Sequence, residues 1–176
     1  MEATTALPVK LVTSIISNSD EITEAVIEEL KEKYGSFDYI SDRLAFDHTD
    51  YYGDEMGREL SRYIISFREL IDPGKLAEVK LFTNALEANF SVEGKRSMNI
   101  DPGYVTLERL VLASCKNFSH RVYLASGVYA ELTLLYKGRS FMALPWSYPE
   151  YTREPILTIM NNIRTTYHKE MNGRGL

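Results

Sequence analysis

The segment that most constrains the fold is Val9–Ser17 (VKLVTSIIS), in which apolar and β-branched residues follow one another almost without a break. Such a run is typical of a central strand that is buried on both faces of a sheet. An amphipathic helix is predicted to follow it, with Asn18 as its N-cap and Gly35 at its end. A chain with these two neighbours is expected to pack helices against a sheet.

The next segments alternate between the residue patterns of strands and helices. Phe37–Phe46 and Glu59–Leu70 are predicted to be two strands that pair with each other, and a second helix is predicted to begin at Asp72-Pro73. Lys95–Ile100 is predicted to be a fourth strand, which ends in a turn at Asp101–Tyr104. This order, β-α-β-β-α-β, predicts an α+β fold with a ferredoxin-like core.

The predicted core occupies residues 9–104, and residues 105–176 are predicted to add a C-terminal β-hairpin extension and a terminal helix within a single domain, 1–176. In this extension Leu107–Ser114 fits either a short helix or a buried strand, and we favour the helix because Thr106 can cap it. The other predicted elements are a hairpin around Ser126-Gly127, a further strand, an irregular segment and a helix, at Arg121–Ala125, Val128–Tyr136, Phe141–Leu144, Pro145–Tyr151 and Ile156–Tyr167.

Composition narrows the classes of partner. The net charge of −5 leaves no general basic face for phosphates of a nucleic acid, so a nucleic acid partner is not expected. The apolar stretches are shorter than the roughly 20 residues of a membrane span, and no membrane partner is expected. The single cysteine, Cys115, excludes a disulfide framework within the chain and fits a reducing compartment, so a cytoplasmic protein is predicted.

Acidic residues gather in one stretch, Phe46–Glu55, which holds four carboxylates between two predicted strands. Mg²⁺ is bound by one or two carboxylates together with water and phosphate oxygens, and loops at strand ends often carry such ligands. Asp47 and Asp50, with Asp101 and Glu131 from later segments, are therefore candidate Mg²⁺ ligands. The alternative is that these carboxylates belong to solvated turns and bond to nearby backbone.

Basic residues gather at Lys116, His120 and Arg121. Lysine and arginine side chains hold phosphate groups, and histidine titrates near neutrality, so His120 is the candidate catalytic residue for proton transfer. Tyr129 and Trp146 are candidate ligand-binding residues, and Trp146 can wall a pocket for a flat ring together with Tyr148 and Tyr151. The alternative is that these residues form a polar loop and pack the last helix onto the sheet.

Several longer strings, spread over nearly the whole chain, resemble a family of uncharacterised bacterial and archaeal proteins that share a domain of unknown function. They include PVKLVTSII, FDHTDYYGDEMG, SFRELIDPGKL, LVLASCKNFSHRVYL and LPWSYPEY. Some members of that family carry the label "GTP-binding protein". The resemblance implies a small cytoplasmic prokaryotic protein and carries over no activity.

The GTP label can be tested against sequence motifs. A P-loop needs the pattern G-x-x-x-x-G-K-[ST], whose backbone N–H groups and lysine hold phosphates, and the sequence lacks both this pattern and the N-K-x-D motif of guanine readers. P-loop GTPase activity is therefore not expected. The predicted function is the binding or processing of a phosphorylated small molecule or nucleotide, with Mg²⁺. The alternative is a non-catalytic protein-interaction or self-association module.

Overall fold

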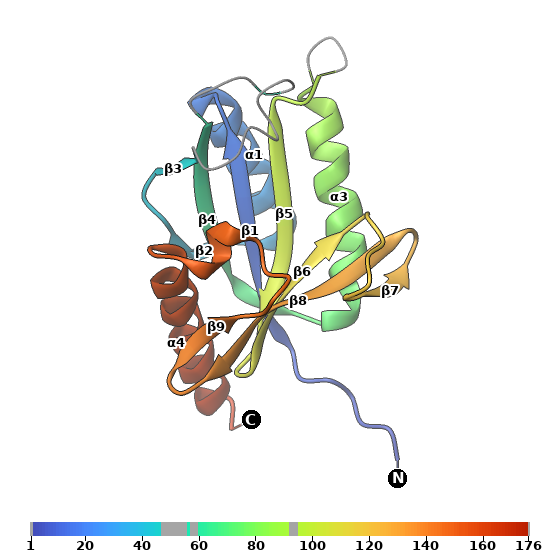
Figure 1. Ribbon diagram of the computed structural model, residues 1–176, viewed down its shortest axis with the longest axis vertical. Coiled ribbons are helices and arrows are strands. Elements are labelled where there is room, and N and C mark those ends of the chain that lie inside the picture. Colours follow the sequence, from blue (N-terminus) through green and yellow to red (C-terminus); the bar gives the residue numbers. More distant parts are fainter. Residues whose placement is uncertain (1, 47–55, 57–59, 92–94, 176) are drawn as a thin grey trace.

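The computed structural model describes residues 2–46, 56, 60–91 and 95–175 (Figure 1). This part of the chain forms three α-helices and one antiparallel sheet of nine strands, so the fold class is α+β. The helices are α1 (Asp20–Tyr34), α3 (Leu76–Asn89) and α4 (Ile156–Gly173), and the 3₁₀ turns are η2 (Pro73–Lys75) and η3 (Pro149–Thr152). The strands are β1 (Val9–Ser17), β2 (Phe37–Ile40), β3 (Leu44–Phe46), β4 (Leu60–Ile71), β5 (Met98–Val105), β6 (Arg109–Ser114), β7 (Arg121–Ala125), β8 (Val128–Lys137) and β9 (Ser140–Ala143).

The strands of the sheet follow the order β2-β4-β1-β5-β6-β8-β7, with β3 also paired to β4 and β9 to β8. β1 lies between β4 and β5, and all nine of its residues are buried. The prediction of a central strand at Val9–Ser17 is thus confirmed. The predicted pairing of the second and third strands is also confirmed, although Phe37–Phe46 is divided into β2 and β3, which pair with β4 one after the other.

Local chemistry determines where α1 begins and ends. Its N-cap is Ser19, whose hydroxyl accepts a hydrogen bond from the Ile22 N–H at 3.3 Å. The prediction that Asn18 is the cap is therefore wrong. The side-chain amide of Asn18 donates a hydrogen bond to the Met56 carbonyl at 2.6 Å instead. Gly35 ends the helix with a φ of 89°, a left-handed value that favours glycine, as predicted.

Helices pack on both faces of the sheet (Figure 1). α1 and α3 cover one face, where Leu11 of β1 belongs to the same apolar cluster as Leu30 and Val79. α4 packs on the opposite face, where Val12 of β1 shares a cluster with Ile159. Neighbouring residues of a strand point to opposite faces, so β1 contributes to both cores. Within the described part of the chain, no helix is both long and apolar enough to cross a membrane.

The prediction of a turn at Asp101–Tyr104 is wrong, because these residues belong to the second half of β5. The N–H and C=O groups of Ile100 bond to side chains of α3, on the side away from β1. By the alternation of a strand, Pro102 points its nitrogen to that same side, so the missing N–H removes no hydrogen bond to β1. Gly103 is needed for close approach of β6, because a Cβ there would lie 2.4 Å from the Val111 carbonyl oxygen.

Leu107–Ser114, for which a helix was favoured, contains strand β6 instead. β6 pairs with β5 and β8, and its four central residues are buried. A short run that is buried on all sides has the same pattern in a helix and in a strand, and here the two neighbouring strands decide the outcome. The predicted hairpin around Ser126-Gly127 and the predicted terminal helix are confirmed as the β7–β8 hairpin and α4.

β5 and β6 are paired over only part of their length, from Gly103–Val105 in β5 to Leu110–Leu112 in β6. Before Gly103, no described strand pairs with this edge of β5. Two side chains of α3 take the place of a strand there. The Lys80 ammonium donates to the Ile100 carbonyl at 2.8 Å, and the Glu87 carboxylate accepts from the Ile100 N–H at 2.7 Å. The sheet therefore has a fork between β5 and β6 that polar side chains of α3 reach.

Candidate functional site

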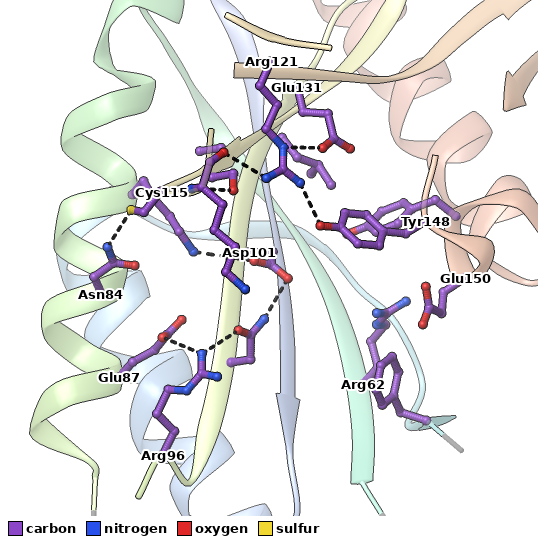
Figure 2. Close-up of a pocket in the computed structure, with 18 of the residues that line it drawn as sticks. Arg62, Asn84, Glu87, Arg96, Asp101, Cys115, Arg121, Glu131, Tyr148 and Glu150 are labelled. Atoms are coloured by element: carbon purple, nitrogen blue, oxygen red, sulfur yellow. Dashed lines mark hydrogen bonds and ion pairs between the residues drawn. The ribbon is translucent and has the colours of Figure 1, made fainter. Parts of the chain in front are cut away.

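A cavity of about 510 Å³ opens at this fork (Figure 2). α3 forms one wall, and Tyr148–Tyr151, at the start of η3, forms the opposite wall. Side chains from β4, β5, β6 and β8 lie between the two walls. Cavities of this size hold small organic ligands, and those ligands are usually fixed by a few polar groups among apolar ones.

The structure brings four of the predicted site residues into the lining of this one cavity: Asp101, Lys116, Arg121 and Glu131. They come from β5, the loop after β6, β7 and β8 respectively. These segments are separate in the sequence, and the antiparallel order of the sheet places them around the fork.

Glu131 is the most enclosed of these residues. Its Oε2 accepts a hydrogen bond from Arg121 Nε at 2.8 Å and lies 3.1 Å from His120 Nε2. Arg121 also donates to the Lys116 carbonyl at 2.9 Å and to the Tyr148 hydroxyl at 2.8 Å. Burial lowers the pKa of Arg121, but the hydrogen bonds to Glu131 and Tyr148 and the charges of these two groups together outweigh burial, so the pKa is raised. Arg121 thus joins three segments of the cavity wall, and Glu131 neutralises its charge.

Asp101 is a residue of β5, and its carboxylate is close to a lysine of α3. Lys80 Nζ is 3.5 Å from its Oδ1, and the Asn99 side-chain amide donates to its Oδ2 at 2.7 Å. The second acidic group on this side is Glu87 of α3, which lies 3.9 Å from the Arg96 guanidinium. Burial raises the pKa of Glu87 by more than Lys80 and Arg96 lower it. The two cations on this side of the cavity, Lys80 and Arg96, therefore already have acidic partners.

His120, Trp146 and Tyr129 do not belong to the cavity lining. The His120 ring stacks on Trp146 with 5.3 Å between ring centroids, and the Trp146 Nε1–H donates to a backbone carbonyl of β8. The Tyr129 ring packs edge-on against Tyr123 at 5.4 Å. His120 therefore reaches the cavity only through Glu131, and a catalytic role for it stays a prediction.

Arg62 of β4 differs from the other cations of the cavity. It is 5% exposed, and its guanidinium lies over the rings of Phe46 and Tyr151, at 4.6 Å and 5.5 Å from the ring centroids. Its buried Nε has no hydrogen-bond partner among the described residues, and no described carboxylate is within ion-pair distance. Glu150 lies on the same side of the cavity in Figure 2, but it makes no ion pair with Arg62.

Two further buried hydroxyls lie near Arg62, and Tyr151, which carries one of them, lines the cavity. The hydroxyls of Tyr151 and Ser14 are buried, and neither makes a hydrogen bond of good geometry to a described residue. Burial raises the pKa of Tyr151 to about 12, although Arg62 and Ser14 oppose this, so its hydroxyl stays neutral and able to donate. Ser14 pairs with Ile64 of β4. Arg62 is two residues before Ile64 on β4, so Ser14 and Arg62 lie on the same face of the sheet.

The cations of the cavity lining differ in whether they have an acidic partner. They are Arg62, Lys80, Arg96, Lys116 and Arg121. Lys80, Arg96 and Arg121 have acidic partners at 3.5, 3.9 and 2.8 Å, and Lys116 also has an interaction partner. Within the described chain, Arg62 is thus the buried cation of this cavity that has no counter-ion. Burying an ion without a partner is costly, so this is where the cavity is best prepared for an anion.

The four predicted Mg²⁺ ligands have different outcomes. Asp47 and Asp50 lie outside the described residues. Asp101 and Glu131 line the same cavity, but their carboxylates are bonded to Lys80 and to Arg121. In the described ranges, no group of three or more His, Cys, Asp or Glu side chains is arranged to hold a metal ion. An Mg²⁺ site built from all four carboxylates therefore stays a prediction.

Arg62 was not among the residues predicted for the site. A signal for Arg62 is present in the sequence, because it alternates with Leu60 and Ile64 on one face of β4, and both of these neighbours are buried. An arginine at a position of buried parity needs a partner or a ligand. Tyr151 was predicted, together with Trp146 and Tyr148, as a residue that can wall a pocket, and the structure places Tyr148 and Tyr151, but not Trp146, in the cavity lining.

The comparison with known proteins gives a family and no activity. No curated protein and no solved structure matches the chain. One family model matches residues 7–167, and its description is "Domain of unknown function (DUF4416)". That description names no ligand and no reaction. Because the match covers most of the chain, this protein belongs to the DUF4416 family of domains of unknown function.

Proposed function

We propose that the cavity at the β5–β6 fork binds a small anionic molecule, and that the ligand is a phosphorylated compound or nucleotide. The observation that carries this proposal is Arg62, a buried guanidinium without a counter-ion in the described chain. Its contacts with Phe46 and Tyr151 hold it in place, and they leave its N–H groups for an acceptor.

The physical reason is the free energy of an unpaired charge. A guanidinium that loses its water without gaining an anion raises the free energy of the folded state by several kcal/mol, on the order found for buried ions. A bound anion removes part of this penalty and forms charge-assisted hydrogen bonds. The folded protein without a ligand is thus less stable at this point than the complex.

The outer part of the cavity suits phosphate groups. Arg121 and Lys116 lie there beside the Tyr148 hydroxyl and the Cys115 thiol. Mg²⁺, if it takes part, would be bound by phosphate oxygens of the ligand as well as by carboxylates such as Asp101. Any proton transfer by His120 would have to act through Glu131, with which it is in contact.

The first half of the chain supports a finer description of the fold. In the order β2-β4-β1-β5, each strand runs antiparallel to its neighbour, and α1 and α3 lie on one face. We propose on this basis that residues 9–104 form a ferredoxin-like core, a fold for which this order is typical. The lone cysteine supports a cytoplasmic location.

The proposal can be tested by thermal shift with a panel of nucleotides, sugar phosphates and other phosphorylated acids, with and without Mg²⁺. A ligand that binds only the folded state raises the melting temperature. We expect at least one compound to do so with wild-type protein, and the shift to be lost in Arg62→Met. The matched control is Arg139→Met, because Arg139 is exposed in the β8–β9 turn, away from the cavity. A panel without any shift, or equal shifts in Arg62→Met, would contradict the proposal.

A second candidate function is self-association through β7. This strand ends the sheet order, and its side chains Val122 and Tyr123 are 68% and 57% exposed. An exposed apolar edge strand can pair with a strand of another chain. Light scattering over a range of protein concentrations tests this candidate. Dimers that dissociate on Tyr123→Lys would support it, and a monomer at all concentrations would exclude it.

A further inference from the structure

The two ends of the cavity differ in exposure. At the inner end, Arg62 and Tyr151 are buried. At the outer end, Cys115, Lys116 and Tyr148 are exposed. A ligand that fills the cavity therefore places one group in a nearly dry environment and keeps the remainder near water. The chemistry of the buried group can be derived from what surrounds it.

Among the described residues, the inner end offers one positive charge and a neutral donor. The charge is that of Arg62, and the hydroxyl of Tyr151 adds a donor without charge, while the Glu150 carboxylate lies on the same side without an ion pair to Arg62. The other cations with known partners are already neutralised, Lys80 by Asp101 and Arg121 by Glu131. The described residues can therefore balance at most one negative charge on the ligand at this end.

A second negative charge there would be unbalanced. The free energy of removing an ion from water rises with the square of its charge, so a buried dianion is far more costly than a buried monoanion. The group must also offer acceptors to the N–H groups of Arg62, which lie in the plane of the guanidinium. A carboxylate meets both conditions, because it carries one charge and presents two oxygens in one plane.

From these observations, and resting on the proposed function, we infer that the inner end of the cavity is a subsite for one carboxylate group. The ligand is then an organic acid. Any phosphate group that it carries lies at the outer end, where Lys116 and Tyr148 are exposed and where water can solvate a second charge.

Arg164 provides an internal comparison for Arg62. Its guanidinium also lies over an aromatic ring, 3.4 Å from the centroid of Tyr136. In contrast to Arg62, however, its Nε donates to the Leu107 carbonyl at 2.7 Å. In Arg164, a stacked arginine with a structural role, the Nε–H is thus satisfied by a backbone carbonyl. The Nε–H of Arg62 is open to an anion, whereas that of Arg164 is occupied.

This difference defines the experiment. The Nε–H signals of the arginines are recorded by ¹H–¹⁵N NMR on the full chain, and the Arg62 signal is assigned from its disappearance in Arg62→Lys or, should that variant not fold, in Arg62→Met. The protein is titrated with formate, methyl phosphate and chloride at constant ionic strength. We expect formate to shift the Arg62 signal saturably and to leave the Arg164 signal unchanged.

The charge of the probe is then varied. A phosphate monoester has a second pKa of about 6, so methyl phosphate is largely a dianion at about pH 8 and gains monoanion at about pH 5.5, whereas formate carries one charge at both. At the higher pH, methyl phosphate should bind at Arg62 about tenfold more weakly than formate, because its second charge is not balanced there. The gap should narrow at the lower pH.

Each other outcome overturns the inference. If methyl phosphate as the dianion binds at Arg62 as tightly as formate, the buried group is not a carboxylate, while the proposed anion site stands. If formate shifts Arg164 as much as Arg62, the effect is not that of a subsite. If no anion moves the Arg62 signal, both this inference and the proposed function fail.

Discussion

Replacement of Arg62 by methionine should stabilise the folded protein. The change removes a buried guanidinium without a counter-ion and keeps most of the side-chain volume against Phe46 and Tyr151. The desolvation penalty that is removed is several kcal/mol, and the two lost cation–π contacts are each about 1–2 kcal/mol. The net gain in the free energy of unfolding is therefore about 1–3 kcal/mol, which for a chain of this size raises Tm by about 3–10 °C.

Arg121→Met is the matched variant with the opposite expected sign. Its guanidinium is also largely buried, but it is bonded to Glu131 at 2.8 Å, and the side chain of Glu131 is only 2% exposed. Removing Arg121 leaves that carboxylate buried without its main cation. Breaking a buried ion pair in this way lowers the free energy of unfolding by about 3–5 kcal/mol.

The assay is urea unfolding followed by circular dichroism, in a buffer without phosphate or other multivalent anions. The slope of the transition should be the same in both variants and in the wild type, so that the midpoint alone reports the change. A loss of about 2 kcal/mol or more in Arg62→Met, similar to that in Arg121→Met, would refute the reasoning. Arg62 would then be a structural residue whose interactions outweigh its desolvation.

Three further predictions concern the parts of the fold that surround the cavity. Gly103→Ala should lower the free energy of unfolding by about 1–3 kcal/mol, because the added Cβ has no space against β6, whereas Gly173→Ala, which meets nothing within 4 Å, should be neutral or slightly stabilising in the same thermal unfolding assay. Because burial raises the pKa of Glu87 above its usual 4.5, the wild type should lose stability as pH rises from 4.5 through the folded pKa, and Glu87→Gln should remove this loss in urea unfolding at several pH values. Lys10→Met should lower the free energy of unfolding by about 3–5 kcal/mol at neutral pH, because it leaves the buried Asp38 carboxylate unpaired. Burial raises the pKa of Asp38, but Lys10 and the hydrogen bond from Ser66 together lower it by more. The contribution of the Lys10–Asp38 pair is therefore present above the usual pKa of 3.8, and the difference between variant and wild type should shrink as pH falls through the lowered folded value.

Most elements of the fold were predictable because their signals are local. The buried strand Val9–Ser17, the helix that ends at Gly35 and the hairpin around Ser126-Gly127 each follow from a few neighbouring residues. The predictions for Asp101–Tyr104 and Leu107–Ser114 were wrong for one shared reason. Their conformation is determined by partners that are distant in sequence, namely β6, β8 and the side chains of α3.

The site was predictable in part for the same reason. Asp101, Arg121 and Glu131 could be selected by residue type, and the sheet brings them to one cavity. Their mutual ion pairing could not be read from the sequence, because it depends on how β5, β7 and β8 are placed in the sheet. Arg62 was not predicted because it belongs to no cluster of charges in the sequence, and its significance comes from being a single charge among buried neighbours.

The central claim is that an anion binds at the buried guanidinium of Arg62. The most direct test is a crystal structure of the protein grown or soaked with bromide, located by its anomalous scattering. The account predicts a bromide peak within about 3.5 Å of Arg62 Nε, at the distance of a hydrogen-bond contact, in the space beside the Tyr151 hydroxyl. Bromide found only at exposed lysines and arginines, with the side of Arg62 closed by other atoms of the protein, would contradict it.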